Sequence, residues 1–558
     1  MELLGRACDQ AFWKQVREKE CYAAFRDDVL KNWQECCEGK GVPELRYRDF
    51  IQFALTGSRT EYEDVYFERR RQLDSAAFLS LMYPEEPKYL TYLSDVIFAI
   101  CNEFSWCLPA HYGPIDKDNS CMIDLFAAET GLALSEVYVM LQDRLDPLIG
   151  ICVKNEVERR IIQPFCSGKR YWWESATYNW AAVCGGSVGC TIMHLRPDLM
   201  DEMRPRLDAI METYLSGMAD DGICKEGVIY WHYGFGHFIL YADMLKTFTD
   251  GAVDYFSRPK VRAIATYVQK MFLSGKSCVS FADAATTMHY HLGIMHYLKS
   301  VYPDDVEVYE RSYSYLYDAR GRLALHLRTL LWYDKKLETT DHPGELTCYA
   351  EDAQWFIRRT DKYGFAAKGG HNDEPHNHND IGAFIFARDG VQIVTDPGKA
   401  KYVRQYFGPD RYTFFHSSSL GHSLPIIGGQ GQKFGRQYRA RDCRVEDGAF
   451  VLDIAGAYGM DALTSLTRRF TFAKNGVSVT DCFIYEGDGV ICERIVCAML
   501  PEQLEVGVVA IGESRLTYDA DAAATVEVSK HTFDGSTDCY TLDVTLKSDV
   551  RSFTYSIE

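Results

Sequence analysis

The period at which hydrophobic residues recur changes once along the chain, between residues 335 and 350. Before this point apolar residues follow steps of three and four, as in Leu90, Leu93, Ile97 and Ile100, which places them on one face of a helix. After it, apolar and polar residues alternate, as in 477–482, a pattern typical of strands with one buried face. The sequence therefore predicts an α+β multidomain protein, with a helical N-terminal part and a mainly antiparallel β-sheet C-terminal part.

Turn residues subdivide the two parts. Pro and Gly interrupt the helical part at irregular spacing and no internal repeat is visible, which favours stacked helical hairpins over a regular solenoid. In the second part, Asn475-Gly476 between two alternating runs predicts a β-hairpin. The 558 residues exceed one ordinary core. We expect a helical domain at 1–335, a linker at 336–350 and a domain of stacked β-sheets at 351–558.

The densest group of ionisable side chains begins with His371, His376 and His378 and continues to Asp396 and His422, although the whole chain has only 15 His. His376 and His378 are two residues apart, so on an extended strand they would point the same way. A β-hairpin over the intervening residues would return Asp396 to the side of His378. Two His, one Asp and an open position suit a zinc-like ion. Polar loops in which His pairs with acids explain the same residues equally well.

Composition limits the classes of binding partner and the cellular compartment that we expect for this protein. The net charge of −19 argues against nucleic acid and anionic membranes as partners, and the lack of an 18-residue apolar run predicts no membrane span. An odd number of Cys, 19, without regular spacing is typical of reduced thiols. No basic segment followed by an apolar core opens the sequence. We expect a cytoplasmic protein, or a secreted one if the sequence lacks its natural start.

Several short motifs resemble, in the same order, those of the heparinase II/III-like polysaccharide lyases. They are His-Asn-Asp-Glu-Pro-His-Asn-His-Asn-Asp at 371–380, Ile-Val-Thr-Asp-Pro-Gly at 393–398, and three further segments at 178–184, 226–233 and 418–425. The resemblance covers roughly residues 100 to 430. It implies an incomplete (α/α) toroid before the β-sheet domain. It also implies β-elimination in a uronic-acid polysaccharide or oligosaccharide, with a glycosaminoglycan as first choice and an alginate-type uronan as second.

Such a reaction needs three groups: one that neutralises the C6 carboxylate, a base at C5 and an acid at O4. The resemblance assigns the first role to Asn179, whose amide donates without adding a titrating charge. It assigns Tyr230 as the proton donor to O4 and a candidate base. His376 is the other candidate base, or the partner that tunes Tyr230.

The resemblance also carries metal ligands and sugar contacts onto this chain. His378, Asp396 and His422 would bind one divalent ion, zinc as first choice and manganese or calcium as alternatives. The ion would be mainly structural, and would fix the loop that presents His376 to Asn179 and Tyr230. Side chains expected to bind the substrate are Trp106, His111, Trp180, Tyr233, His371, Arg411 and His416.

Two other functions fit the same sequence. A glycoside hydrolase acting on unsaturated uronyl oligosaccharides would need paired carboxylates, which Asp220, Asp221, Glu226, Asp283 and Glu374 supply. A non-catalytic protein that binds acidic sugars would bind without turnover. With a net charge of −19, any acidic substrate requires a local cluster of Arg or Lys. The sequence predicts no oligomeric state.

Overall fold

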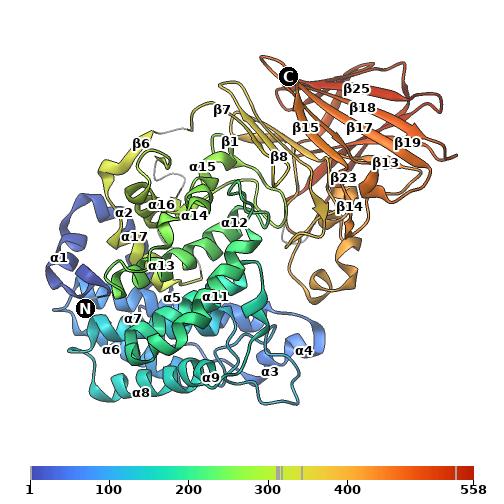
Figure 1. Cartoon of the computed structure of the whole chain (residues 1–558). Helices are drawn as coiled ribbons and strands as arrows, with labels where there is room; N and C mark the ends of the chain where they lie inside the picture. Colours follow the sequence, from blue (N-terminus) through green and yellow to red (C-terminus); the bar gives the residue numbers. More distant parts are fainter. Residues whose placement is uncertain (1–2, 310–313, 316–317, 319, 341–342, 534–536) are drawn as a thin grey trace. The chain divides into compact units, whose positions relative to one another are not determined.

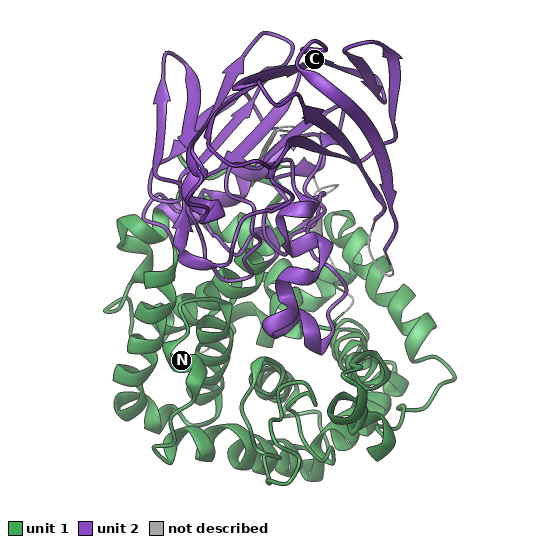
Figure 2. Cartoon of the chain, turned by 90° about the vertical axis from the view of Figure 1, so that its right-hand side faces the viewer, with its two compact units in different colours: residues 1–218, 230–262, 290–340 green, residues 219–229, 263–289, 341–558 purple. Residues whose placement is uncertain are grey.

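The computed structural model describes residues 3–309, 314–315, 318, 320–340, 343–533 and 537–558. The chain forms two compact units, coloured separately in Figure 2. Unit 1 comprises residues 1–218, 230–262 and 290–340, and unit 2 comprises 219–229, 263–289 and 341–558. Helices dominate the first half of the chain and strands the second (Figure 1), so the predicted α+β class is confirmed.

Unit 1 consists of helices that pack in sequential pairs, among them α5 with α6, α10 with α11, and α16 with α17. This is the predicted array of helical hairpins. Its longer helices are α1 Gln10–Glu18, α2 Ala23–Cys36, α5 Thr60–Met82, α6 Pro87–Cys101, α7 Leu125–Leu141, α8 Pro147–Val157, α10 Asn179–Leu195, α11 Met200–Gly217, α13 Gly236–Phe248, α16 Leu292–Val301 and α17 Leu323–Leu331.

Helix α10 is the centre of unit 1. It packs against α7, α11 and α13, and nearly every residue from Asn179 to Met193 is buried. Glycines in α10 make this close packing possible. A Cβ added to Gly186 would lie 2.8 Å from the carbonyl oxygen of His237 in α13, and one on Gly185 would lie 2.7 Å from Ile210 in α11. The position of α13, and of the segment that leads into it, is therefore fixed by α10.

Unit 2 contains two antiparallel sheets. The nine-stranded sheet has the order β23-β24-β19-β12-β11-β9-β8-β7, with β13 beside β19. Its strands are β7 Leu346–Ala350, β8 Trp355–Arg359, β9 Gly364–Lys368, β11 Phe384–Arg388, β12 Val391–Val394, β13 Pro425–Ile427, β19 Ile491–Cys497, β23 Ala523–His531 and β24 Cys539–Leu546. The eight-stranded sheet has the order β15-β16-β17-β18-β25-β22-β21-β20. It contains β15 Asp442–Glu446, β16 Ala449–Asp453, β17 Leu463–Phe472, β18 Val477–Tyr485, β20 Pro501–Glu505, β21 Val508–Ile511, β22 Ser514–Tyr518 and β25 Ser552–Ile557.

The two sheets share one aromatic core. The rings of Phe356 and Phe450, one from each sheet, stack with centroids 5.3 Å apart, and those of Phe384 and Phe470 lie 5.4 Å apart. Alternating burial along β17 follows the predicted alternation of its sequence. The hairpin predicted at Asn475-Gly476 joins β17 to β18. Stacked β-sheets were thus correctly predicted.

Two segments from the helical half of the sequence, 219–229 and 263–289, belong to unit 2. Polar contacts hold them there. Arg359 donates to the backbone carbonyl of Phe272 at 2.6 Å, and the Asp221 carboxylate accepts from the backbone N–H of Asp352 and Ala353 at 2.9 and 3.0 Å. Of the expected linker, residues 338–340 and 346–350 form strands, and 341–342 lie outside the described residues.

Among the described helices, none has the length and apolar character that crossing a membrane requires.

Candidate active site and metal centre

The loop that contains His376 and His378 is not the extended strand that the sequence suggested. Strand β10, His371–Asn372, pairs with β14, Gly435–Arg439, and the chain then turns. His376 has a left-handed backbone with φ +57°, a conformation that is uncommon for a residue with a side chain. The two imidazoles still lie close together. Both contact one buried carboxylate, and the alternation of side chains along a strand plays no part.

That carboxylate is Asp283, whose side chain is 0% exposed. His376 Nδ1 lies 2.7 Å from Oδ2 and His378 Nε2 lies 3.1 Å from Oδ1. The hydroxyls of Tyr406 and Tyr402 donate at 2.7 and 3.1 Å, and Arg411 Nη2 lies 3.2 Å from both oxygens. Burial alone would raise the pKa of Asp283, but the hydrogen bonds from His376 and His378 hold it well below its usual range. The carboxyl group is therefore ionised and acts only as an acceptor.

His376 also faces a second acid. Its Nε2 lies 3.7 Å from Oε1 of Glu226, which is 4% exposed. Gly227 follows Glu226 and has φ +98°. The absence of a side chain lets its backbone lie close to Phe281, because a Cβ added to Gly227 would lie 3.1 Å from the Phe281 carbonyl oxygen. His376 is therefore held between segments 226–227 and 281–283, both of which precede it by more than ninety residues in sequence.

The structure brings the three expected metal ligands together and adds a fourth residue. Ligand atoms of His378, Asp380, Asp396 and His422 all lie within 4.8 Å of one another, and all four side chains are buried. The prediction did not assign a role to Asp380, although it lies two residues after His378 in the same motif. In the part of the chain that the structure describes, His378 Nδ1 and Asp380 Oδ2 have no hydrogen-bond partner, and His422 Nδ1 and Asp396 Oδ2 lie 3.1 Å from each other.

Each of these four side chains is held through its other polar atom. Asp380 Oδ1 accepts from Lys368 Nζ at 2.7 Å, and Asp396 Oδ1 accepts from the backbone N–H of Gly398 at 2.9 Å. His422 Nε2 lies 2.9 Å from the carbonyl oxygen of His416, and His378 Nε2 contacts Asp283. Buried polar atoms without a partner are costly. Two such atoms beside a His–Asp pair, in a group whose ligand atoms are nitrogen or carboxylate oxygen within 4.8 Å of one another, fit a divalent ion such as zinc.

The charges in this cluster support the same arrangement. Burial lowers the pKa of His378, so its imidazole is neutral and offers a nitrogen lone pair. Burial would raise the pKa of Asp396, but the neighbouring His422 lowers it, and the carboxylate is ionised. A neutral imidazole and a carboxylate are the protonation states that a metal ion requires. Burial would lower the pKa of His422, but Asp396 raises it, so a metal ion would have to displace a proton from this ring.

Arg468 fixes the backbone beside two of the four residues. Its Nη1 donates to the carbonyl oxygens of Gly382 and Ser423, at 3.0 and 2.7 Å. These residues follow Asp380 and His422 respectively. The guanidinium is fully buried and pairs with Asp481, whose Oδ2 lies 2.6 Å from Nη2. A buried ion pair of the β-sheet core thus sets the spacing between the two loop segments that carry Asp380 and His422.

In unit 1, Asn179 and Tyr230 lie in segments that pack together. Asn179 is the first residue of α10 and is 2% exposed. Tyr230 directly precedes a π-helical turn, Trp231–Phe235, a feature often found at functional sites. Gly234 in this turn contacts Asn179, since an added Cβ would lie 3.1 Å from its Cα and Cβ. The helix N-terminus that carries Asn179 favours negative charge nearby.

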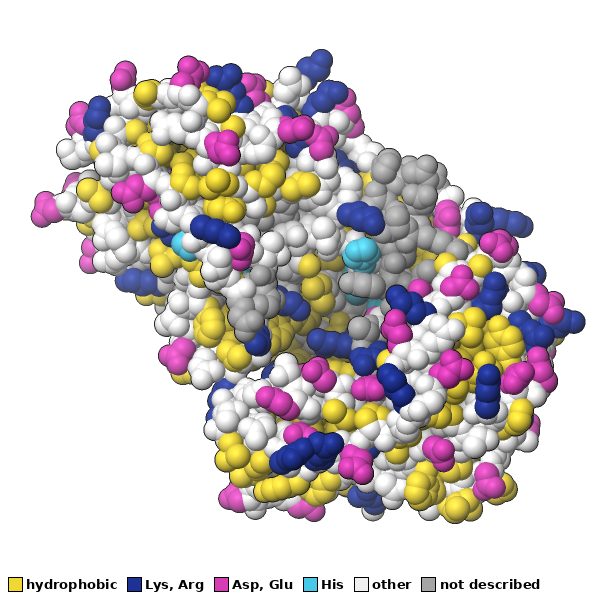
Figure 3. Space-filling view, turned by 180° about the vertical axis from the view of Figure 1, so that it is seen from behind, with side chains coloured by type: hydrophobic (Ala, Val, Ile, Leu, Met, Phe, Trp, Pro, Cys, Tyr) yellow, Lys and Arg dark blue, Asp and Glu magenta, His cyan; other side chains and the backbone are white. Residues whose placement is uncertain are grey.

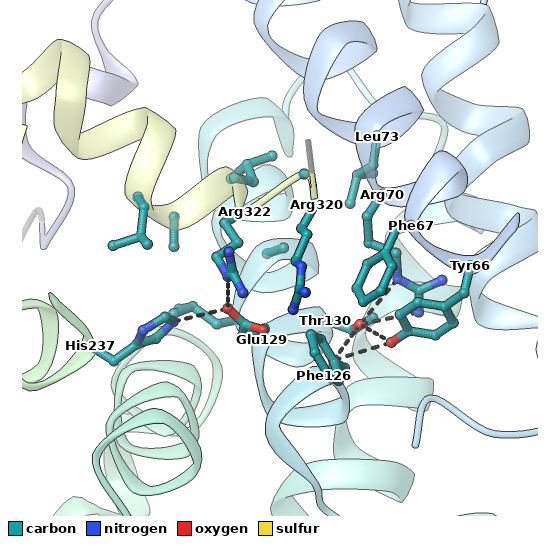
Figure 4. Close-up of a pocket in the computed structure, with 16 residues that line it drawn as sticks. Tyr66, Phe67, Arg70, Leu73, Phe126, Glu129, Thr130, His237, Arg320 and Arg322 are labelled. Carbon is teal, nitrogen blue, oxygen red and sulfur yellow. Dashed lines mark hydrogen bonds and ion pairs between the residues drawn. The ribbon is translucent and has the colours of Figure 1, made fainter. Parts of the chain in front are cut away.

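A pocket in unit 1 lies among α5, α7, α13 and the start of α17 (Figure 4). Glu129 forms its polar wall: Oε1 contacts Arg322 at 3.0 Å and His237 at 3.3 Å, and Oε2 accepts from the Tyr233 hydroxyl at 2.9 Å. Burial would raise the pKa of Glu129, but Arg322 lowers it. Burial, reinforced by Glu129, raises the pKa of Tyr233 well above its usual value. Its hydroxyl therefore stays protonated and bound to Glu129.

Arg320 is the solvent-exposed cation of this pocket. Its guanidinium points into the space between Glu129 and Phe67 (Figure 4) and lies 5.4 Å from the centre of the Phe67 ring. The other two arginines of the pocket are paired, Arg70 with Glu103 at 2.6 Å and Arg322 with Glu129. Neither the pocket nor Arg320 was singled out in the sequence, because its residues come from four separate segments.

The remaining side chains expected to bind substrate fall into two groups. Trp180 and His111 form an aromatic surface with Trp172, which is 50% exposed; the Trp180 ring lies 4.6 Å from Trp172 and 4.9 Å from His111. Trp106, by contrast, is 1% exposed and its indole donates to the Ile100 carbonyl oxygen, so its ring offers no face to a sugar in this structure.

The other polar candidates are occupied by protein groups. Arg411 donates to the carbonyl oxygens of Asn377 and Tyr406 as well as to Asp283. His371 lies 3.0 Å from Glu374. His416 is 3% exposed, and burial lowers its pKa to about 4. These three side chains contact protein groups in the loops around the candidate metal ligands.

The acids that a hydrolase would need are also engaged. Glu374 lies 3.1 Å from Lys225, Asp221 accepts backbone N–H groups, and Asp283 accepts from five side chains. A general acid of a glycosidase needs a raised pKa, whereas the pKa of Asp283 is lowered.

Comparison with solved structures identifies the fold. A crystal structure of heparinase III has a TM-score of 0.62 at 12% identity, over 98% of this chain and 91% of that one. A mutant heparan sulfate lyase from Pedobacter heparinus has a TM-score of 0.61 at 12% identity, over 96% and 89%. A chondroitin AC lyase from Streptomyces coelicolor, in complex with chondroitin sulphate, has a TM-score of 0.55 at 9% identity, over 98% and 82%. No family model and no curated protein matches the sequence.

The chain therefore has a polysaccharide lyase fold, in which a helical toroid precedes stacked antiparallel sheets. Heparinase III and chondroitin AC lyase are the named structures that share it. The resemblance inferred from the sequence motifs is confirmed at the level of the fold.

Proposed function

We propose that this protein is a lyase that cleaves uronic-acid-containing glycosaminoglycan chains or oligosaccharides by β-elimination. The observation that carries the proposal is the packing of Asn179, at the N-terminus of α10, against the π-helical turn that follows Tyr230. The fold likeness to heparan sulfate and chondroitin lyases supports the same reaction class.

Each part of the reaction has a residue of suited chemistry. The Asn179 amide would donate to the C6 carboxylate, and the N-terminus of α10 would add its partial positive charge. This lowers the cost of the negative charge that develops when the C5 proton is removed. Tyr230 would donate a proton to O4 as the glycosidic bond breaks, and His376 would accept the proton from C5. The product carries a double bond between C4 and C5.

The pocket of unit 1 supplies the local positive charge that an acidic substrate needs. Acidic and basic side chains are interspersed over the face shown in Figure 3. The net charge of −19 therefore does not make this face uniformly negative. Arg320 and the Trp172–Trp180 pair offer a cation and aromatic faces, the two surfaces that acidic sugars require.

His378, Asp396 and His422 would hold one divalent ion, with zinc as first choice, and Asp380 is positioned to join them. Bound there, the ion would neutralise the buried carboxylates and fix the loop that carries His376. We assign it no part in the bond-breaking step.

The test is ultraviolet absorbance of the unsaturated product, with heparan sulfate, chondroitin sulfate, hyaluronan and alginate offered in turn. We expect a rise with at least one glycosaminoglycan, and a loss of about 100-fold or more in kcat for Tyr230→Phe, as for removal of a general acid. Tyr47→Phe, on a tyrosine that is 78% exposed, is the matched control and should behave as wild type. Release of reducing ends without absorbance would instead support the hydrolase.

A further inference from the structure

We propose that Asp283 is a positioning residue that fixes the tautomers of two histidines at once. It would hold His378 with its Nδ1 lone pair toward Asp380, Asp396 and His422, and His376 with its hydrogen on Nδ1, so that Nε2, which lies 3.7 Å from Glu226, is the nitrogen that accepts a proton. The part that concerns His376 rests on the proposed lyase function, whereas the part that concerns His378 does not.

The argument begins with the two oxygens of Asp283. Oδ2 contacts His376 Nδ1 at 2.7 Å and Oδ1 contacts His378 Nε2 at 3.1 Å. A carboxylate only accepts hydrogen bonds, so each of these ring nitrogens must carry its hydrogen. In a neutral imidazole the lone pair is then on the opposite nitrogen. One carboxylate thus dictates opposite tautomers, with the hydrogen on Nδ1 in His376 and on Nε2 in His378.

The opposite nitrogen of His378 is the one that faces the metal cluster. Its Nδ1 is buried without a hydrogen-bond partner among the described residues and lies within the group formed with Asp380, Asp396 and His422. Metal-binding histidines commonly donate their second N–H to a carboxylate, which fixes the ring and raises the basicity of the ligand nitrogen. Asp283 is the carboxylate that accepts this hydrogen bond from His378 Nε2.

The position of Asp283 is itself strongly constrained. Tyr402, Tyr406 and Arg411 donate to the same two oxygens, so rotation of the carboxylate would break several hydrogen bonds. The adjacent Ala284 is in close contact with Gly398, where an added Cβ would lie 2.1 Å from the Ala284 carbonyl oxygen. Gly398 is two residues after Asp396, so the backbone beside Asp283 is packed directly on the loop of a metal-cluster residue.

Replacing this carboxylate by an amide changes the tautomers that the site allows. The Asn side chain has one accepting oxygen and one donating NH₂ group. In Asp283→Asn only one histidine can still donate to the oxygen, and the other must present a lone pair to the NH₂ group. That histidine then carries its hydrogen on the nitrogen that should bind the metal or accept the proton.

The experiment measures tautomers and zinc affinity directly. Nitrogen-15 spectra of the full-length protein, labelled in histidine and loaded with zinc, should show the His376 ring protonated on Nδ1 and unmetallated, and the His378 ring protonated on Nε2 with zinc on Nδ1. His422, which contacts the His416 carbonyl oxygen through Nε2, should share the state of His378. His376→Gln and His378→Gln assign the two signals. Wild-type spectra in which these tautomers are reversed overturn the proposal without any further variant.

The variants give the second measurement. Asp283→Asn should lower zinc affinity about 10- to 100-fold, or, if the amide turns the other way, lower kcat by a similar factor with KM nearly unchanged. Asp74→Asn, on a buried aspartate that contacts His326 at 2.7 Å in unit 1, is the control and should retain zinc affinity. Unchanged zinc affinity, tautomers and kcat in Asp283→Asn contradict the proposal.

The two proposals fail in different ways. If the wild type forms no unsaturated product from any uronan, the lyase function is wrong, yet zinc affinity and the His378 tautomer still decide the role of Asp283. If the wild type is an active lyase but Asp283→Asn leaves tautomers, zinc and kcat unaltered, only the inference about Asp283 is wrong.

Discussion

One carboxylate organises each candidate site, fully buried in Asp283 and 14% exposed in Glu129. Asp283 receives hydrogen bonds from His376, His378 and three further side chains, and Glu129 contacts Arg322, His237 and Tyr233. In each case burial alone would raise the pKa, and the surrounding donors lower it. Such carboxylates do not react themselves. They set the orientation of the side chains that contact them.

Arg320 gives the first prediction at this scale. Because it is the exposed cation of the pocket while Arg70 and Arg322 are paired, Arg320→Gln should raise KM for an acidic oligosaccharide about fivefold, which corresponds to about 1 kcal/mol. The effect should shrink as salt is added, since exposed charges are screened. Initial rates at two ionic strengths measure it.

Arg515→Gln, on an exposed arginine that lies 3.0 Å from Glu505 in unit 2, is the matched control and should leave KM unchanged. An Arg320→Gln variant with wild-type KM at low salt would remove Arg320 from substrate binding.

The sequence suggested some of these residues and missed others. The structure brings together His378, Asp396 and His422, which the motif spacing had grouped, and their role as metal ligands stays a prediction. Asp380 had a usable signal, since it lies two residues after His378. Asp283 had none as a partner of the histidines, because 93 residues separate it from His376 and only the packing of segment 263–289 joins them.

At the scale of elements, the close approach of two loops gives the second prediction. Gly398 has φ +63°, and an added Cβ would lie 2.1 Å from the Ala284 carbonyl oxygen. Gly398→Ala should therefore destabilise unit 2 by about 3 kcal/mol or more, through backbone strain and overpacking, and should reduce zinc binding. Thermal unfolding and zinc titration measure the two effects.

Gly448→Ala is the control, because Gly448 has φ +75° but a Cβ there meets nothing within 4 Å in the described structure. It should cost only about 1 kcal/mol and leave zinc affinity intact. If the two variants lose the same stability and the same zinc affinity, the contact between Gly398 and Ala284 does not contribute to either.

The third prediction concerns Glu129, which joins α7 to α13 and to the residue before α17. Because Arg322 lowers its pKa below the ordinary value of 4.5, its contribution to stability is present above pH 4.5 and is lost as pH falls through the folded-state pKa. Glu129→Gln should cost about 3 kcal/mol at pH 7, since Arg322 loses a buried partner. The difference from wild type in thermal unfolding should narrow below pH 4.5, and a constant difference would contradict this account.

Elements were predicted well where local pattern decides them. The alternation at 477–482 predicted β18, and Asn475-Gly476 predicted the hairpin between β17 and β18. The conformation of the loop that carries His376 was not predicted, because His376 adopts a left-handed backbone and contacts Asp283 and Glu226. Such tertiary contacts leave no periodic signal in the sequence.

For the whole molecule, alternation and helical period were sufficient to predict the order of a helical part and stacked sheets, since each pattern spans many residues. They could not predict that 219–229 and 263–289 belong to unit 2. This assignment depends on a few long-range contacts, such as Arg359 with Phe272.

The fourth prediction is the effect of removing the metal ion. At a zinc concentration about 100 times Kd, a bound ion would stabilise the folded protein by about 2.7 kcal/mol, which corresponds to about 5 °C or more in unfolding temperature. A chelator should therefore lower thermal stability and lyase activity together, and added zinc should restore both. His422→Ala should show no further loss on chelation. Full activity in protein without detectable metal would contradict the assignment.

The mass of the reaction products tests the central claim most directly. Elimination adds no water, so a heparan sulfate or chondroitin sulfate oligosaccharide should give two fragments whose masses sum to that of the substrate. The fragment from the reducing side of the cleaved bond should carry the C4–C5 double bond, in the uronate at its new non-reducing end. The account predicts this result for wild type and its loss in Tyr230→Phe. Fragments whose masses sum to the substrate plus one water would contradict it, and would identify a hydrolase.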